Sequence, residues 1–329
     1  MKLYNILLLL FVSLLLTSCI TSPETHPVYD SFVCSINADG TGFQKLVKVS
    51  QLPFDTSQLW DMYVTQNGKL IFDANYLYII DPDSLGQDFL PSVSTDYGQR
   101  YSLSNDNKVY YCSEGMLYQF DLQTNTTRQL TDHIGGDLMN PIISPDNSIV
   151  TLFRNEHDSN GTTTLCYYRL LDDSLIVLPQ AGTATHNGIY NPNNGKIYHE
   201  QNNGLYQIDL DGTNKIHCFN YFTNGCFGFG LSSQKDHIVS VDVSKKLSVF
   251  NILNNTQAFT LVMNDNRVTP KITYDENKVF YVLNGSAYFY DINDHQITSI
   301  PHTEGLSIAM CPTWDGSKIY FIANLRVNK

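Results

Sequence analysis

The chain has 329 residues, and its 32 acidic residues outnumber its 20 basic ones. An acidic surface without a basic cluster repels phosphate groups, which excludes nucleic acid as an expected partner and direct adsorption to anionic lipid as an expected mode of membrane binding. Many tyrosines, phenylalanines and β-branched residues favour strands, and no long stretch has helical apolar spacing, so we predict an all-β fold.

The N-terminus has the pattern of an export signal. Lys2 precedes an apolar run over residues 6–16 that is interrupted only by Ser13. A helix of that length rises about 16 Å, well short of the roughly 30 Å hydrocarbon core of a membrane. We therefore predict a signal peptide over residues 1–18 that is removed before folding.

The end of this run carries a more specific pattern. Leu16-Thr17-Ser18-Cys19 resembles the lipobox of bacterial lipoproteins, in which the signal peptidase cuts before the cysteine and its thiol carries the lipid. The resemblance implies lipidation of Cys19, a lipid-anchored linker over residues 19–30 and a place in the cell envelope. Ile20 stands where an aspartate would favour retention in the inner membrane, so the outer membrane is the expected location.

An ordinary signal peptide of a secreted eukaryotic protein is the alternative. Four Asn-x-Ser/Thr sequons support it, since such sequons are glycosylated in eukaryotic hosts; they begin at Asn125, Asn160, Asn254 and Asn284.

Seven repeats follow the linker, each with a polar turn before a short β-branched and aromatic run. The third residues of these turn-and-strand units are Leu70, Val109, Ile149, Ile197, Ile238, Val279 and Ile319. The spacings between them are 39, 40, 48, 41, 41 and 40 residues, and the long interval contains a polar insertion over residues 155–164. A period near 40 with several strands in each unit predicts the blades of a β-propeller.

A second element recurs behind each of these units. It is a further strand that ends in an acidic or amide turn residue and is followed by a hairpin; the clearest copies are residues 77–81, 117–121, 205–209, 247–251 and 287–291. Residues 33–41 match this third-strand element, whereas the last repeat stops after its second strand near Ala323. We therefore predict a seven-bladed β-propeller of four-stranded blades over residues 31–326, with the N-terminal outer strands completing the blade of the C-terminal inner strands.

Three turn sequences resemble TolB-like propeller repeats: residues 37–42, 144–147 and 314–320. The hallmark of those repeats is a Ser-Pro-Asp-Gly turn before a strand, with an Asp-x-Asp-Gly turn later. The resemblance covers residues 30–325 and implies the fold, but these repeats serve many functions. The TolB protein itself has an N-terminal α/β domain, for which this chain has a lipobox-like segment instead.

Six cysteines follow Cys19, and none has the CxxC spacing of a metal or redox site. Most are expected to be small buried side chains. Cys218 and Cys226, which flank one loop, are the one pair considered for a disulfide.

The sequence has no G-x-S-x-G elbow, P-loop or H-E-x-x-H motif, so we predict no catalytic residue and no cofactor. A binding site is instead expected on the face where the blade connections and the loops between second and third strands meet. The candidate residues are His133, His157, His186, His199, Glu200, Tyr221, Arg267 and His302.

Two functions are consistent with this face. The first is a non-catalytic binding module, anchored through Cys19 as a monomer, for an envelope protein or a glycan. The second is a metal-dependent polysaccharide lyase or hydrolase, because several histidines and carboxylates together can bind a divalent metal. Oligogalacturonate lyases use a histidine-bound metal on such a face, but their ligands cannot be matched to residues of this chain.

Overall fold

The computed structural model describes residues 28–52, 59–74, 76–82, 87–90, 101–132, 136–158, 162–182, 185–201, 204–220, 226–231, 237–242, 246–254, 256–263, 270–273, 275, 277–303 and 306–327. One compact unit, Ser31–Asn324, holds the fold; the other consists of Met1–Asp30 and Leu325–Lys329. The predicted signal peptide, Cys19 and most of the predicted linker lie outside the described residues. In the described part of the chain, no helix is both long and apolar enough to cross a membrane.

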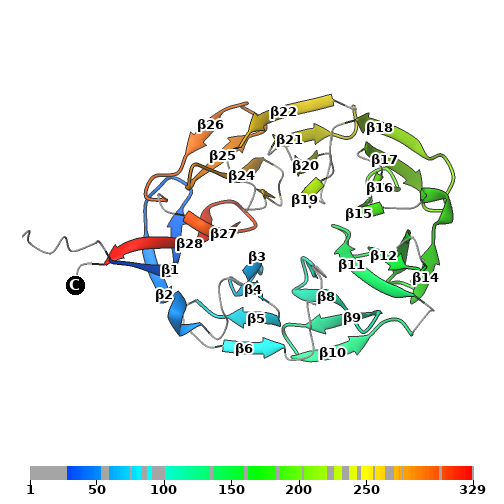
Figure 1. The fold of residues 1–329 in the computed structure, drawn as a ribbon, viewed down its shortest axis with the longest axis horizontal. Coiled ribbons are helices and arrows are strands. Elements are labelled where there is room, and N and C mark those ends of the chain that lie inside the picture. The colour runs from blue at the N-terminus through cyan, green and yellow to red at the C-terminus, as the bar shows by residue number, and fades with distance from the viewer. Residues whose placement is uncertain are drawn as a thin grey trace, which may run out of the picture. The chain divides into compact units, whose positions relative to one another are not determined.

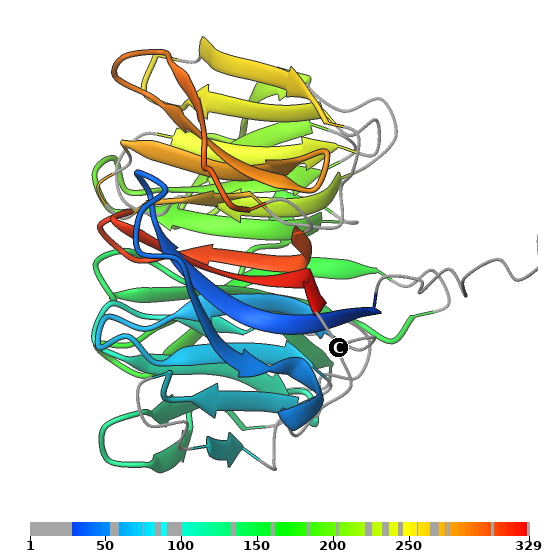
Figure 2. The same ribbon diagram turned by 90° about the vertical axis from the view of Figure 1, so that its left-hand side faces the viewer.

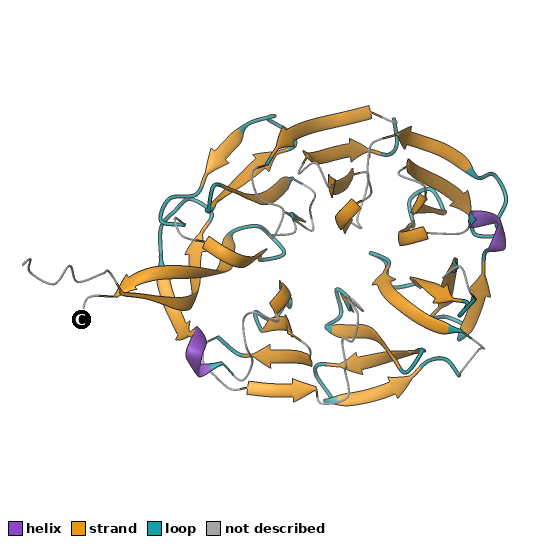
Figure 3. Cartoon of the chain, in the orientation of Figure 1, coloured by secondary structure: helices purple, strands orange, loops and turns teal. Residues whose placement is uncertain are grey.

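Seven four-stranded antiparallel sheets form a ring, as the repeat predicts (Figures 1 and 3). We number the blades along the chain. Blades 1 to 3 consist of β3 (Leu59–Val64), β4 (Leu70–Ala74), β5 (Tyr76–Ile80) and β6 (Gln87–Leu90); β7 (Ser102–Leu103), β8 (Lys108–Ser113), β9 (Met116–Asp121) and β10 (Thr126–Gln129); and β11 (Asp137–Ile143), β12 (Ile149–Asn155), β13 (Thr163–Arg169) and β14 (Ser174–Val177).

Blades 4 to 6 repeat this arrangement, with the first strand innermost and the fourth at the rim. They consist of β15 (Thr185–Asn191), β16 (Lys196–Gln201), β17 (Gly204–Asp209) and β18 (Ile216–Asn220); β19 (Cys226–Leu231), β20 (His237–Asp242), β21 (Lys246–Asn251) and β22 (Thr256–Val262); and β23 (Lys271–Ile272), β24 (Lys278–Leu283), β25 (Ser286–Asp291) and β26 (Ile297–Ser299). The helical segments of the described residues are two single turns, η1 (Val49–Gln51) and η3 (Pro179–Ala181).

Blade 7 combines the two ends of the chain. Its strand order is β2 (Gln44–Lys48), β1 (Val28–Asn37), β28 (Lys318–Val327) and β27 (Leu306–Pro312), so the C-terminal strands are inner and the N-terminal strands are outer. Figure 2 shows β1 beside β28. The Ser31 hydroxyl donates to Asn324 Oδ1 at 2.5 Å, and the Ala38 N–H donates to the Ser317 carbonyl at 2.8 Å. The predicted closure is therefore confirmed.

The core lies between neighbouring blades, because each sheet is covered on both faces. Tyr110 and Leu117 of blade 2, for example, share one buried cluster with Leu152 and Tyr168 of blade 3. Each of these side chains is at most 1% exposed. The β-branched and aromatic runs of the sequence thus provide the two apolar faces that every blade needs.

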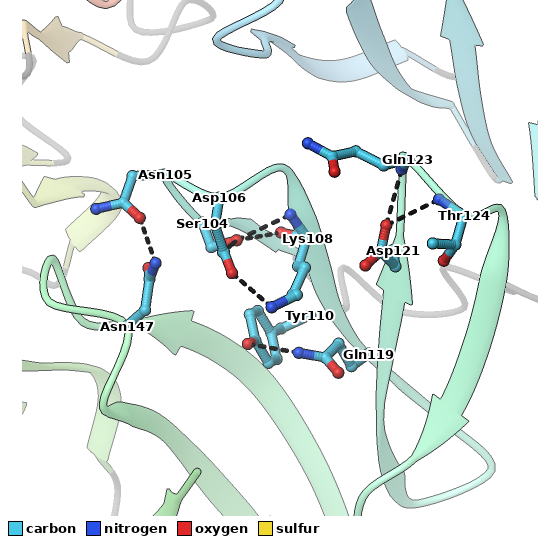
Figure 4. Close-up of polar contacts among 10 residues, drawn as sticks. All are labelled: Ser104, Asn105, Asp106, Lys108, Tyr110, Gln119, Asp121, Gln123, Thr124 and Asn147. Carbon is cyan, nitrogen blue, oxygen red and sulfur yellow. Dashed lines mark hydrogen bonds and ion pairs between the residues drawn. The ribbon is translucent and has the colours of Figure 1, made fainter. Parts of the chain in front are cut away.

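Among the described turns between first and second strands, five are fixed by a hydroxyl side chain. In blade 2, Ser104 Oγ donates to Asp106 Oδ1 at 2.6 Å and accepts from the Lys108 N–H at 2.9 Å (Figure 4). Each hydroxyl donates to the side-chain oxygen of the Asp or Asn two residues later, and the five are Thr65, Ser104, Ser144, Thr273 and Thr313. In blade 7 the Thr313 hydroxyl lowers the pKa of Asp315. In the polar turns of the sequence repeat, a side-chain hydroxyl therefore holds the turn backbone in place through hydrogen bonds.

The hydrogen bonds of the Ser104 hydroxyl predict that removing this group lowers the stability of the protein. Ser104 is 2% exposed, so Ser104→Ala leaves the Lys108 N–H and the Asp106 carboxylate without this partner. We expect the free energy of unfolding to fall by about 1–3 kcal/mol in urea denaturation. Ser104→Thr is the matched control, since threonine holds the same position in three other blades, and it should cost much less. Equal losses in both variants would contradict this role of the hydroxyl.

Candidate functional site

The strand order divides the loops between two ends of the ring. Since successive strands of a blade are antiparallel, the turns between second and third strands lie at the same end as the connections between blades. We call this end the connection face. The turns between first and second strands and between third and fourth strands lie at the opposite end, the turn face. Figure 2 shows the blades from the side, with the two ends at its left and right.

The structure describes four of the eight candidate side chains. Those of His157, His199, Glu200 and His302 are described, whereas His133, Tyr221 and Arg267 lie outside the described residues. The backbone of His186 belongs to β15, but its side chain is not described. His302 is exposed in the turn after β26, with a φ of +62°.

Two candidate residues assigned to loops from the sequence lie in a strand instead. His199 and Glu200 both belong to β16. The second strands extend further toward the connection face than the short repeat motif indicates. This correction matters because a residue in a middle strand is covered by its neighbours, whereas a loop residue is not.

The polar insertion of blade 3 is held by side-chain pairs. His157 Nε2 lies 3.0 Å from Asp137 Oδ2 at the start of β11. Arg154 donates through Nε and Nη2 to Glu156 Oε1, at 2.9 and 2.8 Å. Asp158 accepts from the Thr162 N–H at 2.7 Å. The described residues of the insertion are thus held in place on the connection face by side-chain contacts. Sequence reasoning did not identify Asp137 as the partner of His157, because the two residues are far apart in the sequence.

His199 is a buried residue of the interface between blades 3 and 4. It is 1% exposed and pairs across the strands with Gly188. It lies on the same face of β16 as Ile197, which packs with Phe153 and Leu165 of blade 3. The pKa of His199 is lowered to about 4, because burial disfavours the charged ring and Lys215 repels it. At neutral pH this imidazole is therefore uncharged.

Lys215 connects blade 4 to η3, the single helical turn that precedes this blade. Its Nζ donates to the Ala181 carbonyl of η3 at 2.5 Å and to Gln201 Oε1. The same ammonium lies 4.9 Å from the ring centroid of Tyr206, which stacks on His199 at 5.8 Å. Burial lowers the pKa of Lys215. Glu200, 3% exposed, lies on the opposite face of β16 from His199.

No group of three or more His, Cys, Asp or Glu side chains suited to a metal ion occurs among the residues that the structure describes. The side chains of four of the eight candidates lie outside that set. Cys218 carries a free, half-buried thiol, and so the structure contains no bridge from Cys218 to Cys226. The thiols of Cys112 and Cys166 are buried, and burial raises the pKa of both.

Comparison with known proteins gives matches in structure alone. No family model and no curated protein sequence matches the chain. An oligogalacturonate lyase in complex with manganese is 13% identical with a TM-score of 0.61, over 91% of this chain and 96% of its own. An oligogalacturonate lyase from Vibrio parahaemolyticus is 12% identical with a TM-score of 0.56, over 89% and 91%.

A protein described as "putative TolB" from Agrobacterium tumefaciens is also similar. It is 11% identical with a TM-score of 0.51, over 91% of this chain and 100% of its own. The fold is a TolB-like seven-bladed β-propeller. Identities this low establish the fold and leave activity open, since one propeller fold supports enzymes and binding modules alike.

Two glycines allow a test of how tightly η3 sits against blade 4. Gly182 has a φ of +93°, and a Cβ there would overlap the Gln201 amide; Gly68 has a φ of +83° with open space around its Cβ position. We expect Gly68→Ala to cost about 1 kcal/mol of unfolding free energy through its backbone alone. Gly182→Ala should cost clearly more, because Gly182, at φ +93° and ψ −178°, has a backbone conformation that is essentially restricted to glycine, and the new Cβ would also overlap Gln201. Equal costs of the two variants would contradict a tightly fitted Gly182.

Proposed function

We propose that this protein is a non-catalytic binding module of the cell envelope, anchored through a lipid on Cys19, whose connection face receives a protein or glycan partner. Two features support this proposal: the lipobox-like sequence at the N-terminus and the closed ring of blades. A short linker between the anchor and the ring would keep the folded ring close to the membrane surface.

The observation that carries this proposal is the state of the polar groups on the described part of the connection face. His157 is paired with Asp137, Arg154 is paired with Glu156, and His199 is buried and uncharged. General acid–base catalysis needs a group within reach of a substrate and with a pKa near the working pH. Buried His199 meets neither condition, while the pairs of His157 with Asp137 and of Arg154 with Glu156 hold the insertion.

The net acidic composition favours a partner that is neutral or basic on its contact surface. A polyanion would be repelled over distances up to about the Debye length, roughly 8–10 Å at physiological salt. A neutral glycan, or a protein with lysines and arginines on its contact surface, meets no such barrier. Tyr221 and Arg267 remain candidate contact residues on the strength of the sequence.

A metal-dependent polysaccharide lyase or hydrolase is the second candidate. It is favoured by the likeness to two oligogalacturonate lyases, one of them in complex with manganese. Under this alternative, His133 and His186 would be the first residues to substitute. Cleavage of oligogalacturonate by the purified protein with added Mn²⁺ would replace the binding module with this alternative.

Site-specific photo-crosslinking in cells compares the two faces of the ring directly. A photoreactive residue at Glu114 or Asp132 probes the connection face, and one at Gln123 or Asp294 is the matched probe of the turn face; all four positions are exposed. We expect one reproducible partner from the first pair and none from the second. Equal capture from both faces would contradict the proposed binding face.

The anchor is tested in the same cells. Wild-type protein should incorporate a clickable fatty acid and fractionate with membranes, and Cys19→Ser should lose both properties. Unlabelled wild-type protein would contradict the anchor while leaving the crosslinking result intact.

A further inference from the structure

The interface between blades 3 and 4 contains a buried imidazole, that of His199. Within the described residues, neither Nδ1 nor Nε2 of His199 has a hydrogen-bond partner, although the residue is 1% exposed. Its Cβ lies close to the space that a side chain at Gly188 would fill, next to Leu165 and Phe153 of blade 3. The ring is therefore held mainly by packing and stacking, and its one polar contact that favours the charged form is with the Glu200 backbone.

The repeat shows what this position requires. His199 lies two residues after its anchor Ile197, and the same position holds Tyr111 in blade 2 and Tyr281 in blade 6. Each stacks on the cross-strand tyrosine of its own blade: Tyr111 on Tyr118 at 5.4 Å, Tyr281 on Tyr288 at 5.8 Å and His199 on Tyr206 at 5.8 Å. In blades 2, 4 and 6 this position holds a flat, buried ring, whereas Thr151 and Ser240 hold it in blades 3 and 5. Of the three stacked rings, His199 is the one that gains a charge in acid.

The surroundings of His199 oppose a positive charge. Blade 3 contributes the apolar side chains of Phe153 and Leu165. Blade 4 contributes the Tyr206 ring, with His217 edge-on to it at 4.9 Å and the Lys215 ammonium over it. On β16, Gln201 is neutral and Glu200 lies on the opposite face; of β15, the His186 side chain is not described. The described groups that face His199 thus include an ammonium and a second histidine but no carboxylate.

We propose that His199 makes the interface between blades 3 and 4 acid-sensitive: its protonation expels the imidazole from the interface and loosens the contact between η3 and blade 4. A charged imidazolium at this place is buried beside apolar side chains and the Lys215 ammonium, and no carboxylate is among the described groups that face it. Lys215 transmits the change, since the ammonium that repels the imidazolium is the one bound to the Ala181 carbonyl. This inference is independent of the ligand of the ring.

The pH range follows from the two states of the histidine. In the closed interface the pKa of His199 is about 4, whereas a solvated imidazole titrates near 6.5. The open state therefore binds a proton that the closed state does not bind, and closure weakens as the pH falls from about 6.5 to about 4. The interface is fully stabilised above this range, and no further loss from His199 is expected below it.

Hydrogen exchange followed by mass spectrometry tests the proposal on the full folded chain. After correction for the intrinsic exchange rate, the opening constant of residues 178–201 should rise on the order of 100-fold from pH 7 to pH 4. Residues 278–291, which hold Tyr281 and Tyr288, are the internal reference and should stay nearly constant. A common pH dependence of both segments would overturn the proposal.

Two variants separate the imidazole from its neighbours. His199→Tyr places the residue of blades 2 and 6 at this position, and the rise of the opening constant should disappear. His217→Gln removes the other histidine of the stack and should leave the rise intact. A rise that persists in His199→Tyr, or one that disappears in His217→Gln alone, would contradict the role of His199.

A direct titration of the wild-type protein keeps the test open if His199→Tyr fails to fold. In heteronuclear NMR, the His199 ring should stay neutral down to about pH 4, with protonation accompanied by shifts in the amides of η3 and β16. Protonation near pH 6.5 in the folded protein, or protonation without those shifts, would overturn the proposal.

Discussion

The pairing of β1 with β28 is the constraint on which the rest of the structure depends. It joins residues at opposite ends of the chain, as the bond from Ser31 to Asn324 shows. Without it, blade 7 would be a two-stranded hairpin, and the inner strands of the C-terminus would present a free edge. With it, every blade has a neighbour on both sides, and the apolar face of each sheet is buried by the next.

Closure also determines what the ring offers to other molecules. Blades packed on both faces leave side chains free at the two ends and the rim, so function is confined to loops and to the strand ends beside them. At the connection face, His157 and Arg154 are paired within the insertion of blade 3, and His199 is buried in the interface between blades 3 and 4. The insertion of blade 3 is held by its own side-chain pairs. The strength of the interface between blades 3 and 4 depends on the charge of the His199 imidazole. We propose that such a ring binds its partner through shape and through a few exposed contacts.

The sequence predicts the architecture well because the same turn-and-strand pattern occurs seven times. The anchors from Leu70 to Ile319 give the number of blades, and the match of residues 33–41 to a third strand gives the closure. The candidate site is predicted less well, because its residues lie where strand ends and loops cannot be separated by pattern. His199 is assigned to a loop on that basis, yet its alignment with Tyr111 and Tyr281 is a signal for a buried stacked ring. The pairing of Asp137 with His157 has no such signal, since it depends on how the insertion folds back.

A disulfide across the junction tests the closure most directly. Ser31→Cys combined with Asn324→Cys replaces the hydrogen bond between β1 and β28 by a reducible bond, with each single variant and the reduced double variant as controls. If the ring is one closed unit, oxidation should raise the free energy of unfolding by about 2–4 kcal/mol, and hydrogen exchange should slow in all blades, including blade 4 on the far side. Protection confined to the strands of blade 7 would show that the blades open independently, and would contradict the account.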